Sequence, residues 1–98
     1  MLVHILTNNR NDISTEWYIL PLSVLTKRQE FYIGSGLIVD RIEEETSDSL
    51  SRTVTTKFVS TAAFEQYTAD PEIFPMFKLR NEYNTLNNIT TNTTTTQL

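Results

Sequence analysis

The chain has 98 residues, the size of one small domain, and its 8 basic and 12 acidic residues give a net charge of −4. This acidic balance disfavours a nucleic acid partner, because binding a polyanion depends on clustered lysine and arginine. The chain has no cysteine, which excludes disulfides and thiolate metal sites. No apolar run approaches the roughly 18 residues of a membrane span. The first residues lack the features of a secretory signal, so we expect a cytoplasmic protein without a membrane partner.

The N-terminal third predicts a strand followed by a helix. Residues 2–7 are a short apolar run bounded by an Asn- and Asp-rich turn, and they predict a strand with apolar side chains on both faces. From Ser14 the apolar residues follow helical spacing, which predicts an amphipathic helix that ends at Gly34. Pro21 either kinks this helix or marks the first turn of its regular part.

The middle of the chain predicts a β-hairpin. Its two arms are residues 37–45 and 50–60, and the second arm is rich in β-branched residues. The register that we expect places Glu43 opposite Arg52 on one sheet face, where opposite charges attract across strands. Together with Arg41 they predict an ion cluster at the surface or at the rim of a dimer, which would contribute little to stability.

The last third predicts a broken helix and a final strand. Residues 62–67 form a short helix capped by Ser60 or Thr61, and helical spacing resumes over residues 70–86. The Thr- and Asn-rich end favours a strand that begins near Ile89. We expect about 92–98 to be a loose polar tail.

The element order is therefore β, α, β, β, α, β, which predicts a single ferredoxin-like α+β domain over residues 1–98. Its four-stranded antiparallel sheet carries the helices on one face. The other face would leave apolar side chains in water, which is unusual for a monomer. A second copy packed sheet to sheet covers them, so we expect a homodimer.

Several segments resemble the dimeric α+β barrel superfamily, which includes the antibiotic-biosynthesis-monooxygenase-like proteins. The similar parts are residues 58–67 with Asp70-Pro71, then Arg80, Tyr83 and Ile89, and the helix-to-strand junction at 31–38. The chain also looks similar to small dimeric ferredoxin-like proteins of marine metagenome or phage type, which have no assigned function. The resemblance implies a fold that hosts cofactor-independent oxygenases, haem-degrading proteins and small-ligand binders. The haem-degrading pattern is not matched, because the one histidine lies in a predicted strand rather than on a helix.

The candidate site residues follow from their chemistry. His4 is the natural general acid or base, and its alternative role is a histidine packed in the sheet or the dimer seam. A further set could line an apolar pocket for an aromatic ligand between the helices and the sheet, or could simply form the core: Trp17, Tyr32, Arg52, Tyr67 and Tyr83. Arg52 could also grip a carboxylate. One histidine without cysteine predicts no metal site, and we expect no cofactor.

Three functions remain open at this point. The first is a non-catalytic dimer that binds a small apolar or aromatic organic ligand or a partner protein. The second is a cofactor-independent monooxygenase-like enzyme that uses His4 and a tyrosine. The third is a structural or regulatory accessory protein without a ligand. A cavity of roughly several hundred cubic ångströms lined by His4 and a tyrosine would favour the first two, and a filled interior the third.

Overall fold

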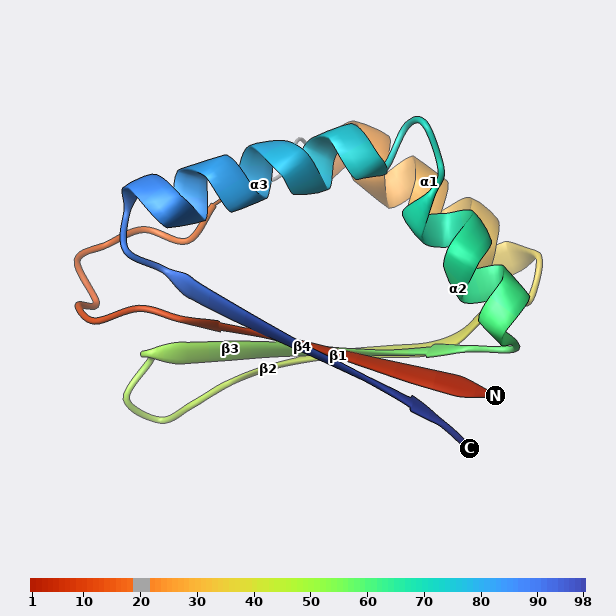
Figure 1. Cartoon of the computed structure of the whole chain (residues 1–98), viewed down its shortest axis with the longest axis horizontal. Helices are drawn as coiled ribbons and strands as arrows, with labels where there is room; N and C mark the ends of the chain where they lie inside the picture. Colours follow the sequence, from red (N-terminus) through yellow and green to blue (C-terminus); the bar gives the residue numbers. More distant parts are fainter. Residues whose placement is uncertain (19–21) are drawn as a thin grey trace.

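The computed structural model describes residues 1–18 and 22–98, with the side chains of 1–18 and 27–98. Its elements, in chain order, are β1 (Leu2–Asn9), α1 (Leu22–Gly34), β2 (Ile38–Glu45), β3 (Ser51–Phe58), α2 (Thr61–Thr68), α3 (Phe74–Leu86) and β4 (Thr90–Gln97). The strands form one antiparallel sheet in the order β2-β3-β1-β4, and the helices lie on the same side of it (Figure 1). The ferredoxin-like α+β prediction is confirmed, with the second helix broken into α2 and α3.

Alternation along the strands sorts the side chains into a helix-facing set and an open set. On β1 the helix-facing residues are Leu2, His4, Leu6 and Asn8, and on β3 they are Arg52, Val54, Thr56 and Phe58. At one end of the sheet Leu2 and Phe58 are paired and buried, and they join the main core cluster with Tyr32 and Ile73. The other end of the same face is more polar, so the core is concentrated at one end of the layer.

The hairpin register differs from the expected one. Glu45 pairs with Arg52 and Glu43 pairs with Val54, so the expected pairing of Glu43 with Arg52 is wrong. The reason is a longer loop. The Thr46 N–H donates to the Ser51 carbonyl at 3.0 Å, and Ser49 takes the left-handed conformation at φ 61°, which shifts the second arm along.

The C-terminal residues also differ from expectation. Residues 92–98 are not a loose tail, because β4 continues to Gln97 and pairs with β1 over its whole length. The backbone N–H of Leu98 donates to the carbonyl of Met1 at 2.8 Å, and the two termini lie side by side (Figure 1). Threonine has good strand propensity, and β1 offers a free edge of backbone donors and acceptors for this segment to satisfy.

The described residues that precede α1 are not helical, although the sequence placed helical spacing from Ser14, and α1 begins at Leu22. Residues 11–18 form turns and irregular backbone, so the predicted helical position of Trp17 is wrong. Pro21, where a kink or a first turn was predicted, lies outside the described residues.

Of the two later helices, α2 has a side-chain cap, whereas Ile73 at the N-cap of α3 makes no such bond. Ser60 precedes α2, and its hydroxyl accepts a hydrogen bond from the Ala63 N–H at 3.1 Å, which confirms one of the two predicted caps. Asp70 lies in the break between α2 and α3. Its carboxylate accepts from the Glu72 N–H at 2.8 Å and so caps the turn that leads into α3.

Candidate functional site

A cavity of about 200 Å³ lies between the helices and the sheet. Its floor consists of side chains in three cross-strand rows of β2, β3 and β1: Arg41–Thr56–His4, Glu43–Val54–Leu6 and Arg52–Asn8. Its walls come from α2 and α3, through Phe64, Tyr67, Phe77 and Arg80, and from Gln29 of α1 and Tyr18 of the preceding loop. The cavity is smaller than the several hundred cubic ångströms expected for a ligand site, yet it is lined by His4 and tyrosines as expected.

His4 lies on the cavity floor beside an aromatic wall. Its ring is 5.1 Å from the Phe64 ring, centroid to centroid, and its Nδ1 is 3.4 Å from the Thr95 hydroxyl. Burial, and then the nearby positive charge of Arg80, lowers the pKa of His4 below its usual 6.5. The imidazole is therefore neutral at pH 7 and can accept a proton or a hydrogen bond from an occupant of the cavity.

Arginines carry most of the charge around the cavity. Arg41 is paired with Glu43 at 2.9 Å. The Arg52 guanidinium lies 5.7 Å from the centre of the Trp17 ring, and that of Arg80 lies 4.7 Å over the Phe77 ring. The Nε of Arg80 is buried and has no hydrogen-bond acceptor among the described residues.

Three of the six predicted site residues meet at this cavity. His4, Arg52 and Tyr67 line it together. Tyr67 offers its hydroxyl, which accepts from Gln29 Nε2 at 3.2 Å, and burial foremost raises the pKa of this tyrosine.

The other three predicted residues serve contacts elsewhere. Tyr32 is buried in the core and donates to Asp70 at 2.8 Å; its burial and this bond raise the pKa of Tyr32 to about 12. Tyr83 donates to the backbone carbonyl of Glu16 at 2.6 Å. Neither side chain is among those that line the cavity.

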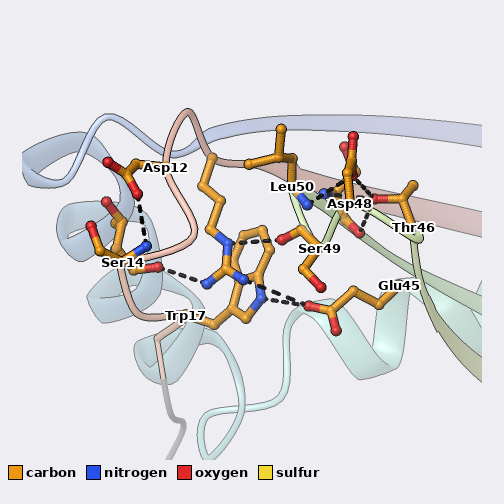
Figure 2. A network of polar contacts seen from close by, with 11 residues as sticks. Asp12, Ser14, Trp17, Glu45, Thr46, Asp48, Ser49 and Leu50 are labelled. Carbon is orange, nitrogen blue, oxygen red and sulfur yellow. Dashed lines mark hydrogen bonds and ion pairs between the residues drawn. The ribbon is translucent and has the colours of Figure 1, made fainter.

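Trp17 belongs to a separate contact network that ties the loop before α1 to the hairpin tip (Figure 2). Its indole N–H donates to Glu45 Oε1 at 2.9 Å. The Arg10 guanidinium stacks over the indole at 4.3 Å and donates to the carbonyls of Ser49 and Thr15 at 2.9 and 2.7 Å. Trp17 thus links the loop that carries it to the tip of the β2–β3 hairpin.

Several lining residues were not predicted from the sequence. Arg41 and Glu43 form an ion pair at the surface, as expected, but they were not predicted to line the cavity as well. Arg80 lies within the predicted helical stretch of residues 70–86 and was not named as a site residue. A charged residue within an apolar helical stripe could have indicated this role, because charged side chains are rarely buried unless they have a partner. Tyr18 and Gln29 gave no comparable signal.

The described residues contain neither a candidate metal cluster nor a membrane-spanning helix. No group of three or more histidine, aspartate and glutamate side chains gathers where it could hold a metal ion. No helix in this part of the chain is long and apolar enough to cross a membrane.

Comparison with known proteins identifies the fold. No family model matches the sequence, and no curated protein is similar to it in sequence. Among solved structures, a provisionally assigned antibiotic biosynthesis monooxygenase from Deinococcus radiodurans superimposes with a TM-score of 0.67 at 11% identity, covering 100% of this chain and 92% of that one. SnoaB, a cofactor-independent oxygenase from Streptomyces nogalater, matches with a TM-score of 0.67 at 13% identity, covering 99% and 91%. A conserved protein from Methanosarcina mazei matches with a TM-score of 0.66 at 10% identity, covering 98% and 91%. The chain therefore shares the ferredoxin-like α+β fold of these solved structures.

Proposed function

We propose that the protein is a cytoplasmic homodimer that binds a small aromatic organic ligand in the cavity between its helices and its sheet. The observation that carries the proposal is the composition of the cavity. Phe58, Phe64 and Phe77 offer aromatic surface, and His4 and Tyr67 bring polar atoms to the same space. Ligand sites in proteins combine apolar walls with a few polar groups in this way.

The volume sets the size of the ligand. A dry cavity of about 150 Å³ is enough to hold benzene, so the space of about 200 Å³ found here suits one ring or two fused rings. This range selects naphthalene derivatives as probes.

The test uses two valine-to-phenylalanine changes. Val54 lines the cavity, whereas Val59 follows the same strand and is 47% exposed outside it. We expect a two-ring probe, titrated by amide NMR, to shift signals of cavity residues in the wild type. Val54→Phe fills the cavity and should weaken binding by about tenfold or more, while Val59→Phe should leave it unchanged. A full panel of neutral and charged probes that shifts no cavity signal would contradict the proposal and favour an accessory protein without a ligand.

A second candidate function is cofactor-independent oxygenation. Its support is the neutral His4 on the cavity floor, which can accept a proton from an acidic substrate group, together with the fold shared with SnoaB. This function predicts that oxygen is consumed when the protein binds a reactive substrate. His4→Ala should abolish this oxygen uptake while substrate binding persists. Binding without oxygen uptake across substrates would leave the non-catalytic function standing alone.

A further inference from the structure

The cavity has an unusual charge for this protein. Three arginines line it (Arg41, Arg52 and Arg80) against a single glutamate, Glu43, so with His4 neutral the lining carries a formal charge of +2. The whole chain carries −4. A positive hollow in an acidic protein focuses its field on an anion in that hollow.

The two arginines outside the Arg41–Glu43 pair have no carboxylate within ion-pair distance among the described side chains. Arg52 lies against the Trp17 ring. Glu45, its neighbour across the strands, is occupied by the indole N–H of Trp17. Arg80 lies against the Phe77 ring, and its one hydrogen bond from a terminal nitrogen goes to Asn81 Oδ1 at 3.3 Å.

Of these two arginines, Arg80 is the one with a buried nitrogen that lacks a hydrogen-bond partner. Its Nε is the one buried side-chain nitrogen or oxygen, among the described residues, that lacks a hydrogen-bond partner. Burying a guanidinium donor without an acceptor is unfavourable, and buried polar groups in native proteins nearly always find a partner. An acceptor supplied by a ligand satisfies this donor, and the side chain already lines the cavity.

We propose that the ligand of this cavity is an aromatic carboxylate, with its acid group held by Arg80 and its ring packed against the aromatic wall. This inference rests on the proposed ligand-binding function and specifies its ligand class. A carboxylate matches the planar fork of a guanidinium and accepts two parallel hydrogen bonds from it. Phe64, Phe77 and Tyr67 supply the surface for the ring, and the volume of about 200 Å³ limits the ligand to about two fused rings.

The decisive experiment compares three naphthalene probes that share one ring system: 2-naphthoate, its neutral amide 2-naphthamide, and the cationic 2-naphthylmethylamine. Calorimetry and amide NMR on the full chain give their affinities. We expect the naphthoate to bind about tenfold or more tightly than the amide, and the cation to bind weakest of the three. Added salt should weaken the binding of naphthoate and leave the binding of the amide nearly unchanged.

Two variants on α3 assign the effect to Arg80. Arg80→Met keeps much of the side-chain volume and should abolish the preference for naphthoate over its amide, changing the amide affinity by less than about threefold. Lys78→Met removes one charge from an exposed position of the same helix and should preserve the preference. Arg80→Lys retains the positive charge without the planar guanidinium fork, so it should retain only part of the preference for naphthoate.

The outcomes separate the two proposals. Equal affinity for naphthoate and naphthamide in the wild type overturns the carboxylate inference and leaves the ligand-binding function intact. A preference that survives Arg80→Met overturns the role of Arg80. Failure of all three probes to bind contradicts the proposed function itself. If Arg80→Met does not fold, the wild-type ratio and the Arg80→Lys variant still decide the question.

Discussion

Among the individual residues, His4 has a pKa that two different effects shift in the same direction. Burial disfavours the imidazolium, and the Arg80 guanidinium repels it. The sequence identified His4 by residue type alone, since the chain contains one histidine. It could not give the pKa, because Arg80 lies on a helix distant in the chain and only the fold brings the two together.

We predict that the His4 ring titrates with a midpoint below 6.5 and that Arg80→Met raises this midpoint, because the repulsion is lost while the burial remains. The one histidine makes the ring signals in a proton NMR titration unambiguous. Lys78→Met, the exposed change on the same helix, should leave the midpoint in place. A wild-type midpoint at or above 6.5 would contradict the described environment.

The same shift sets the pH dependence of stability. The folded pKa lies below the unfolded value of 6.5, so the unfolded chain takes up its proton first as the pH falls. The contribution of the neutral His4 ring to the free energy of unfolding is therefore complete above pH 6.5, and it is lost as the pH falls toward the folded pKa of His4. His4→Gln should remove this part of the pH dependence.

Among the elements, Asp70 is the residue that joins α1 to the break before α3. Its carboxylate accepts from Arg28 at 2.6 Å and from Tyr32 at 2.8 Å, both on α1. Burial pushes the pKa of Asp70 upward, but the bonds from Arg28, the Glu72 N–H and Tyr32 outweigh it and hold the pKa below its ordinary value. The sequence placed the break of the second helix near Asp70, whereas the bonds from Arg28 and Tyr32 join residues distant in the chain.

We predict that Asp70→Asn lowers the free energy of unfolding by about 2–3 kcal/mol, because it removes the charge that Arg28 and Tyr32 donate to. Glu72→Gln is the matched control. Glu72 pairs with the same Arg28 at 3.1 Å but its side chain is 58% exposed, so the expected loss is about 0–1 kcal/mol. Urea denaturation at pH 7 measures both. Equal losses in the two variants would refute the assignment of Asp70 as the buried link.

The elements that were mispredicted share a physical cause. The hairpin register depends on Ser49 adopting a positive φ and on Asp48 accepting from the Thr46 hydroxyl and the Leu50 N–H, details of one loop that composition does not specify. The polar strand β4 forms because β1 offers it an edge, which is a tertiary effect. The described loop before α1 carries Trp17 because Arg10 and Glu45 hold it there. Element order was readable from periodicity, whereas these placements required partners distant in the sequence.

For the whole molecule, the cavity and the open sheet face arise from the same alternation of side chains. Alternate side chains of the strands face the helices, where several of them line the cavity, and the others face away from the helices. The sequence predicted apolar residues on both faces of the first strand, and Leu2 and Leu6 lie on the helix side while Val3 and Ile5 lie on the open side. Val54 and Phe58 of β3 also face the helices, so the open face is rich in threonine, with its apolar residues at the centre.

The apolar residues at the centre of the open sheet face support a homodimer. One cross-strand row of the open face reads Ile42–Thr55–Ile5–Thr94, and Val3 lies two residues along β1 from Ile5. Ile42 is 46% exposed, and no helix of the described chain covers this face (Figure 1). A second copy packed sheet to sheet buries this row on both chains, as a two-fold interface requires.

We predict that the wild type has twice the single-chain mass of 11.3 kDa in light scattering and that Ile5→Lys reduces it to one chain. Lysine at position 5 would be buried in the dimer without a partner charge, which strongly disfavours association. Leu79→Lys is the control, since Leu79 is 51% exposed on α3, on the helix side of the sheet, and this variant should keep the wild-type mass. A wild type at 11.3 kDa would refute the dimer without touching the carboxylate inference, because every residue named for that site belongs to one chain.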